Sequence, residues 1–446
     1  MPDRRPMERA ASPGLSSAMA EPRTTRERAE EAVKWAAVLL GCSIPVSVAA
    51  DNVLLGFILL CWIAGGGYRD KLAAIRRHPA ALAALALFAM YLAGTLYTIG
   101  SGRDVVDALT KALRLLLIPA LIPLLREPEW RARGLAAFVG SMLVSLALSY
   151  LLWLGVLSAN PWLKGTELDP VAFKAHITHN VFMAFAAFLL ALAAVDAKSR
   201  RGRLALFALS AAAIVNVLVM VPGRTGHIVL FVLFTYFLYR QLRAKGFALA
   251  VAALGVLAVV VFLSPDTMLH KRIAVADDEF QQWQAGVPAP LESSIGQRMG
   301  ILRHTLEVIR ENPVLGVGTG GFAAAYAALA SGAGDAPSNN PHNEFLMIVA
   351  QFGLAGLALL LCLFGTQWWL AAHLPGRFEQ AAARGLVLTI VVASILSSTL
   401  VDHAEGLFFA YMSGLLFASY GGAEKHGWRR VPAPAGDGAA SAKRHV

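Results

Sequence analysis

The sequence predicts an all-α protein, a polytopic helical bundle of about twelve transmembrane helices with one large extramembrane loop that contains amphipathic helices. Two observations predict this class. Hydrophobic residues make up 57% of the 446 positions and charged residues only 15%, which is not the composition of a soluble globular domain. Apolar segments of the roughly 20 residues needed to cross a hydrocarbon core recur along most of the chain.

The expected spans are separated by connections that alternate in basicity. They cover residues 33–49, 52–67, 79–99, 105–125, 134–157, 177–196, 203–222, 226–241, 246–264, 344–370, 383–401 and 405–421. Clusters of Lys and Arg follow the second, fourth, sixth and eighth spans. Because cytoplasmic loops are enriched in these residues, we expect these four connections and both termini in the cytoplasm.

The net charge of +10 does not indicate a nucleic-acid partner. The basic residues form short clusters between apolar segments rather than one continuous face, a pattern typical of topology signals. The cysteines, Cys42, Cys61 and Cys362, lie inside apolar segments, so the sequence indicates neither a disulfide nor a metal site.

These patterns divide the chain into five parts. Residues 1–32 mix Arg, Glu, Pro and Ser, which predicts a disordered cytoplasmic extension rather than a cleavable signal. Residues 33–264 hold the first nine spans, 265–343 the extramembrane loop, 344–421 the last three spans, and 422–446 a basic cytoplasmic tail.

The loop contains two expected helices joined by a glycine-rich turn. Apolar residues recur at spacings of four and three over 293–311, which predicts an amphipathic helix that Pro313 terminates. A second short helix is expected over 321–330. The intervening Gly316, Gly318, Gly320 and Gly321 lack the Lys of a phosphate-binding loop, so we favour a structural turn packed against helices.

Arginines in two places suit an anionic headgroup. Arg224 lies in a Pro/Gly-shaped break between two apolar spans, where it either marks a membrane boundary or binds an anion. Arg298 and Arg303 lie on opposite edges of the apolar stripe of helix 293–311, and Arg298 is the one that we expect to face a site. A guanidinium presents a rigid fork of donors that matches diphosphate oxygens.

A histidine lies where the loop meets the tenth span. His342 is followed by Asn343 and precedes Gly353 and Gly356, whose spacing of three allows close backbone approach. A lone histidine is more often structural than catalytic, but an imidazole at a wet membrane boundary is suited to accept a proton near neutral pH.

Together these residues resemble the O-antigen ligase and polymerase superfamily. His342-Asn343 with Gly353 and Gly356 is similar to the family's His-Asn/Ser/Gln…Gly…Gly signature, and Arg298…Leu302 is similar to its Arg-x-x-x-Leu element. Arg224 occupies a loop where the family has a basic residue. The motif pair is moderately specific for the superfamily and weakly specific for the member.

The resemblance implies a metal-independent, inverting membrane glycosyltransferase without a cofactor. His342 would be the base at the acceptor hydroxyl, and Arg298 and Arg224 would hold the donor's undecaprenyl diphosphate. For an O-antigen ligase, the donor is an undecaprenyl-diphosphate-linked glycan and the acceptor the lipid A core. Such an enzyme lies in the Gram-negative inner membrane, with its active site and residues 265–343 in the periplasm.

Further polar residues are expected near the substrates. Arg303, Asn343 and Asp402 rank next, and Asp402 belongs either to a solvated turn or to the residues that orient His342 or an arginine. The remaining candidates are Lys174 and His176, which either line the acceptor entrance or mark the interface, and Arg103, Lys111 and Arg114, which share a rough helical face suited to phosphates of the lipid A core. His176 and His179 lack a third ligand at suitable spacing, so a metal is not favoured.

Two alternatives stay open within the superfamily, an O-antigen polymerase and a protein O-oligosaccharyltransferase. A lipid or polysaccharide transporter or flippase is the alternative from another class. It is less favoured because the candidate charges lie at the membrane boundary rather than the midplane and no internal repeat is evident. The catalytic interpretation requires Arg224, Arg298 and His342 to converge at one wet pocket.

Overall fold

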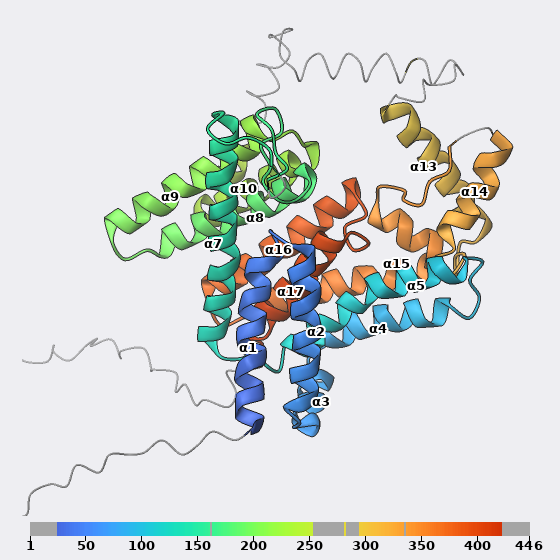
Figure 1. Ribbon diagram of the computed structural model, residues 1–446, viewed down its shortest axis with the longest axis horizontal. Coiled ribbons are helices and arrows are strands. Elements are labelled where there is room, and N and C mark those ends of the chain that lie inside the picture. The colour runs from blue at the N-terminus through green and yellow to red at the C-terminus, as the bar shows by residue number, and fades with distance from the viewer. Residues whose placement is uncertain (1–24, 161–162, 253–280, 282–293, 334–335, 422–446) are drawn as a thin grey trace, which may run out of the picture.

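The computed structural model describes residues 25–160, 163–252, 281, 294–333 and 336–421, and its regular elements are all helical (Figure 1). In chain order these elements are α1 (Thr25–Ser43), α2 (Val48–Ala64), α3 (Tyr68–Arg76), α4 (Pro79–Gly94), α5 (Gly102–Ala112), the 3₁₀ turn η1 (Leu113–Leu116), α6 (Leu117–Leu121), α7 (Pro128–Trp153), α8 (His176–Asp196), α9 (Arg200–Val215), the π turn η2 (Asn216–Met220), α10 (Arg224–Leu242), α13 (Ser294–Glu311), α14 (Phe322–Ala333), α15 (Glu344–Ala371), α16 (Arg377–Leu396) and α17 (His403–Phe417).

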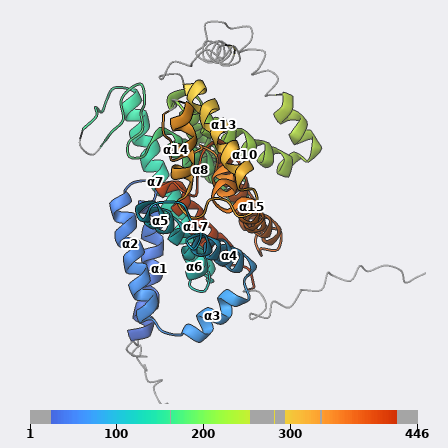
Figure 2. The same cartoon turned by 90° about the vertical axis from the view of Figure 1, so that its right-hand side faces the viewer.

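Five of the described helices are long and apolar enough to cross a membrane, which makes this a multi-pass membrane protein. They are α7, α8, the continuous α9–η2 segment, α15 and α16. The pair α2 and α3 makes a sixth candidate, bent by 113° at the glycines between the two helices (Figure 2). Most of the expected spans coincide with a helix, but the expected number of about twelve is not confirmed. The expected span 246–264 lies mostly outside the described residues.

The expected span 105–125 is wrong as a single helix. It is divided into α5, η1 and α6. Ser101 caps α5 in a reciprocal capping box with Asp104, so the helix begins before the apolar segment. Asp104, Asp107 and Lys111 then recur at helical spacing, which gives α5 a polar face that a membrane-spanning helix would not expose to lipid.

The expected disorder of residues 1–32 is also wrong for its last part, because α1 already begins at Thr25. Arg26 and Glu30 are four residues apart on this helix, and Arg26 Nε lies 3.1 Å from Glu30 Oε1. Such pairs support an exposed helical turn. Residues 1–24 and the expected tail 422–446 lie outside the described residues.

The core lies around α8 and α17. Rings from three helices, Phe138, Phe182, Phe185 and Phe408, pack with centroids 4.6–6.3 Å apart. Figure 1 shows α17 in the middle of the molecule, with α4, α5 and α15 lying beside one another. Because α17 is buried along nearly its whole length, the turn that precedes it is held in a fixed position.

Helix α15 is interrupted at Gly353, and the preceding loop fills the break. Gly353 has φ 60° and ψ −158°, a conformation that is essentially restricted to glycine. The carbonyls of Ala350 and Gln351 accept hydrogen bonds from the N–H groups of Val317 and Gly318 (2.9 and 2.8 Å) instead of from their own helix. In return, the N–H groups of residues 354 and 355 donate to the carbonyls of residues 313 and 314. A loop is thereby joined to the break with its backbone groups satisfied.

The glycines of this loop form a structural turn, as expected. Gly316, Gly318 and Gly320 all have positive φ. A Cβ at these positions would lie 2.3–2.6 Å from the backbone of Gln351, Thr98 and Asp104, respectively. The expected helices on either side, 293–311 and 321–330, are confirmed as α13 and α14. The glycine turn therefore fastens the loop to α4, α5 and α15 at once.

Candidate functional site

The N-terminal ends of several helices meet on one side of the bundle. Thr178 at the start of α8 donates a hydrogen bond to Glu405 at the start of α17 (2.6 Å). Asn180, also on α8, donates to the carbonyl of Val221 just before α10 (3.2 Å). Unpaired N–H groups give a helix N-terminus partial positive charge. The shared rim of these helices is therefore suited to anions.

The segment that begins α15 is tied to the turn before α17. Asn343 caps α15 by accepting from the N–H of Leu346, and its amide nitrogen donates to the carbonyl of Ile395. Glu344 is fully buried and accepts from the N–H of Leu400 (2.9 Å). Both ends of the Asn343 amide make a hydrogen bond within the protein, which gives this residue a structural role; its expected contact with a substrate stays a prediction.

His342 lies at this junction with a constrained backbone. Its φ is 54°, a left-handed conformation that non-glycine residues seldom adopt. The N–H of His342 donates to Oδ1 of Asn340 (2.8 Å), and the hydroxyl of Ser398 donates to the same oxygen (2.7 Å). The imidazole is exposed. Such strain is frequent at functional sites, where neighbouring residues hold the backbone in place.

Asp402 lies in the turn between α16 and α17, close to His342. Burial raises the pKa of this carboxyl, and the positive charges of Lys111, Arg114 and protonated His342 lower it in turn. An acidic group near an imidazole stabilises the imidazolium that forms when the ring accepts a proton. The expected role of Asp402 in orienting His342 or an arginine stays a prediction.

Arg114 fastens this turn to a buried carboxylate. One guanidinium nitrogen donates to the carbonyl of Asp402 (2.7 Å), and the other lies 3.2 Å from Nδ1 of His403. On the far side of the ring, His403 Nε2 lies 3.5 Å from Oδ2 of Asp51. Asp51 is fully buried, and its other oxygen accepts from Ser43.

Lys174 completes the buried group. Its Nζ lies 3.7 Å from Oδ2 of Asp51 and makes no hydrogen bond within the described part of the chain. Burial lowers the pKa of Lys174, and the nearby Asp51 opposes that shift. His176 is more exposed, with Nδ1 3.7 Å from Asp169. Lys174 therefore attaches the connection between α7 and α8 to the start of α2, whereas His176 lies at the surface.

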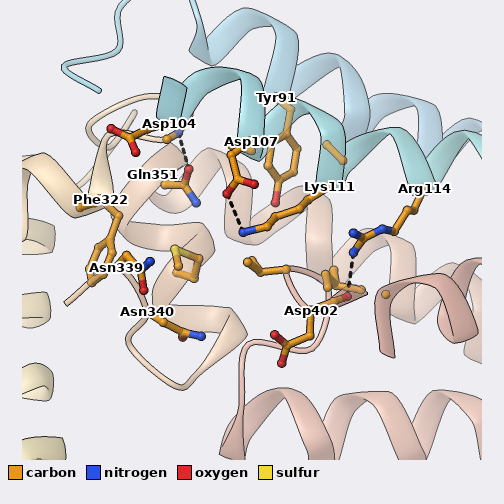
Figure 3. Close-up of a pocket in the computed structure, with 18 of the residues that line it drawn as sticks. Tyr91, Asp104, Asp107, Lys111, Arg114, Phe322, Asn339, Asn340, Gln351 and Asp402 are labelled. Atoms are coloured by element: carbon orange, nitrogen blue, oxygen red, sulfur yellow. Dashed lines mark hydrogen bonds and ion pairs between the residues drawn. The ribbon is translucent and has the colours of Figure 1, made fainter. Parts of the chain in front are cut away.

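A polar pocket of about 300 Å³ opens beside Asp402 (Figure 3). Its walls come from α4, α5, η1, α14, α15 and α17, and from the turns at 320, 339–340 and 400–402. Its ionisable and amide side chains are Tyr91, Asp104, Asp107, Lys111, Arg114, Gln351 and Asp402, together with two adjacent asparagines. Asn340 is one of these asparagines, so the residue that holds His342 also lines the pocket.

The other expected residues lie at separate positions. Arg224 is exposed as the first residue of α10, and Arg103 is exposed near the start of α5. Arg303 is exposed on α13 beside His304. Arg298 belongs to α13, but its side chain lies outside the described part of the structure. The convergence of Arg224, Arg298 and His342 therefore stays a prediction.

Comparison with known proteins matches part of this chain to a family. Residues 209–361 match the family model described as O-Antigen ligase. The matched segment covers 153 of the 446 residues and supports the O-antigen ligase superfamily. It runs from α9 through α10, α13 and α14 into α15, so it contains Arg224, Arg298, His342 and the break at Gly353.

No curated protein sequence matches this chain. Among solved structures, one similar chain comes from a study titled "Structural coordination of polymerization and crosslinking by a peptidoglycan synthase complex". It is 16% identical, with 78% of this chain and 98% of that chain covered and a TM-score of 0.46.

Several residues of this rim and of the pocket were not expected from sequence. The amphipathic pattern of α5 would have revealed Asp104 and Asp107. Asp51 could have been found as the acidic residue of the apolar segment 48–64, since charge within a membrane segment marks a functional candidate. Gln351 and Asn340 gave no signal, because amides are common in helices and loops.

Proposed function

We propose that this protein is an O-antigen ligase, which transfers an undecaprenyl-diphosphate-linked glycan to a hydroxyl of the lipid A core at the periplasmic face of the inner membrane. The observation that supports this most is the position of His342. This histidine belongs to the ligase-family domain, is held by Asn340 in a left-handed conformation, and lies near Asp402 at a rim of helix N-termini.

In the proposed reaction the acceptor hydroxyl attacks the anomeric carbon of the donor sugar. A carbon–oxygen bond forms to the acceptor as the bond to the diphosphate oxygen breaks, which inverts the configuration. The hydroxyl proton passes to His342, and ionised Asp402 stabilises the resulting imidazolium. The electron pair leaves with the undecaprenyl diphosphate, so no metal-bound nucleophile is needed.

The leaving diphosphate requires positive charge. Arg224 presents an exposed guanidinium at the N-terminus of α10, where the partial charge of the helix end has the same sign. We assign Arg298 of α13 as the second guanidinium. Arginines suit this role because their donors match phosphate oxygens in pairs.

The decisive experiment supplies purified protein with a lipid-linked glycan and, separately, lipid A core, a peptide or no further acceptor. Glycan joined to the core alone supports the ligase. Longer glycan without core would indicate a polymerase, and a glycosylated peptide would indicate a protein O-oligosaccharyltransferase. Movement of the lipid-linked glycan across proteoliposomes without any new glycosidic bond would instead indicate a flippase.

A pair of histidine variants tests the base. We expect His342→Ala to abolish transfer without loss of folding, because this imidazole is the proposed base and is exposed on the surface of the fold. His373→Ala is the matched control, since His373 follows the opposite end of α15 and is exposed. Full turnover in His342→Ala would remove the proposed base from the mechanism.

A further inference from the structure

The polar pocket beside Asp402 lacks a ligand assignment. We propose that it binds an unphosphorylated sugar ring of the acceptor, through hydroxyl groups, and presents that sugar to His342. This inference rests on the proposed function and names the part of the acceptor that the site recognises. Four features of the pocket support it: its charge, its unpaired polar groups, its size and its position.

The charges of the pocket disfavour a phosphate. Three aspartates line it against one lysine and one arginine. Both cations are already engaged, because Lys111 Nζ lies 2.7 Å from Asp107 and Arg114 binds the carbonyl of Asp402. A phosphate would meet carboxylates of its own sign without a free cation. These contacts favour a neutral ligand over the lipid A phosphates that Lys111 and Arg114 were expected to bind.

Two largely buried residues present polar atoms to the pocket that make no hydrogen bond within the described residues. Gln351 is 4% exposed, and its oxygen accepts from the N–H of Gly320 (2.7 Å), while its amide nitrogen makes no hydrogen bond within the described residues. Tyr91 is 6% exposed, and its hydroxyl likewise makes none there. In Figure 3 both groups point into the pocket. Neither atom is itself fully buried, so both can be reached from the pocket and can bond to a ligand hydroxyl there.

The other walls also suit a sugar. Carboxylates accept hydrogen bonds and amides both accept and donate them, so Asp107 and Asn339 together match adjacent hydroxyl groups. Phe322, which is 2% exposed, closes one side of the pocket with an apolar edge. A volume of about 300 Å³ lies at the lower limit for ligand pockets and suits a single small unit rather than a glycan chain.

The pocket and the proposed diphosphate site lie on different elements. The pocket walls do not include α8 or α10, where the exposed Arg224 lies. Asn340 and Asp402 line the pocket and also lie beside His342. A sugar in this pocket is therefore next to the proposed base, and the donor approaches from α10.

Binding of simple sugars to the full-length protein in detergent tests this without turnover. Saturation-transfer NMR would compare methyl α-glucoside with glucose 1-phosphate, which differ chiefly in the phosphate. We expect the glucoside to bind at least about fivefold more tightly, the effect of about one hydrogen bond. Equal or tighter binding of the phosphate, or no binding of the glucoside, would overturn the proposal.

Matched tryptophan variants on α14 locate the binding. Ala323 lines the pocket, whereas Ala328 is exposed on the same helix. Ala323→Trp should fill the pocket and lower glucoside binding at least about fivefold, while Ala328→Trp leaves it unchanged. Unchanged binding in Ala323→Trp, with a folded protein in size-exclusion chromatography, contradicts the assignment.

A charge variant keeps the proposal testable if Ala323→Trp does not fold. Asp107→Asn frees Lys111 from its ion pair, so the preference should shift toward glucose 1-phosphate by about tenfold. An unchanged preference would refute the charge argument.

Failure of the proposed function has a different result: the glucoside still binds, but no glycan is transferred. Conversely, if folded Ala323→Trp still transfers glycan with an unchanged acceptor KM, the proposed function is retained and the assignment of the pocket to the acceptor sugar is refuted.

Discussion

Asn340 offers a direct test of how His342 is held. Its Oδ1 accepts from the exposed N–H of His342 and from the hydroxyl of the buried Ser398. The exposed bond contributes about 0.5 kcal/mol and the buried one about 1 kcal/mol. Together the two bonds stabilise the left-handed conformation of His342 by about 1.5 kcal/mol, which Asn340→Ala would remove. The fraction of molecules with a correctly placed His342 should then fall roughly tenfold.

The assay is transfer of lipid-linked glycan to lipid A core, with kcat and acceptor KM measured separately. We expect kcat of Asn340→Ala to fall about tenfold. Asn340→Asp is the matched control, because it retains an oxygen in the same place and should recover most of kcat. Wild-type kcat in Asn340→Ala would refute the argument, and so would an equal loss in both variants.

Three further predictions concern charge and backbone. Burial raises the pKa of Asp402 above its ordinary 3.8, so ionised Asp402 is lost and kcat should fall as the pH decreases through that raised value. Protonation of the base His342 also lowers kcat at low pH, so Asp402→Asn should remove only the part of the acid limb that depends on Asp402, at a lower overall rate. Because a raised carboxyl pKa stabilises the fold at low pH and this stability is lost as the pH rises, the variant should melt no earlier than wild type at pH 7. Asp51→Asn leaves Lys174 without its buried counter-charge, so the free energy of unfolding in detergent should fall by about 3 kcal/mol. Adding Lys174→Met should recover part of this loss. Equal stability of Asp51→Asn and wild type would contradict the pairing. Gly353→Ala should lower the free energy of unfolding by at least about 3 kcal/mol, because its Cβ would lie 2.1 Å from the backbone of Val314. Gly365→Ala is the control: it has open space around it and should leave the melting temperature unchanged or slightly raised.

The long apolar helices could be predicted closely from sequence. The expected spans 177–196 and 344–370 correspond to α8 (His176–Asp196) and α15 (Glu344–Ala371). Both are long apolar segments with polar residues at their ends, so composition alone defines them. The amphipathic helix α13 was similarly clear from its periodicity. These elements depend on local sequence and little on their neighbours.

Breaks within apolar segments could not be predicted in the same way. Residues 105–125 have the composition of a span, but the Ser101 cap and the 3₁₀ turn divide them. The interruption at Gly353 exists because another segment supplies the missing hydrogen bonds. Hydropathy averaged over a sequence window detects neither a helix cap nor a hydrogen-bond partner that is distant in sequence.

The candidate site was predicted in its residue types rather than its contacts. His342, Asp402 and Arg114 were singled out from their positions near expected membrane boundaries. Their proximity depends on how α5, α15 and α17 pack, which no spacing along the chain specifies. Asp51 is distant in sequence from Lys174 and His403, so its buried contacts emerge only from the fold.

The exchange of hydrogen bonds at the interruption of α15 ties both sides of the break to one loop. The carbonyls of residues 350 and 351 before the break and the N–H groups of residues 354 and 355 after it all bond to residues 313–318. A displacement of α13 or α14, which flank this loop, would therefore be passed by backbone bonds to both parts of α15. A ligand that pulls on these two helices would shift α15 at the break, and with it the turns that follow His342.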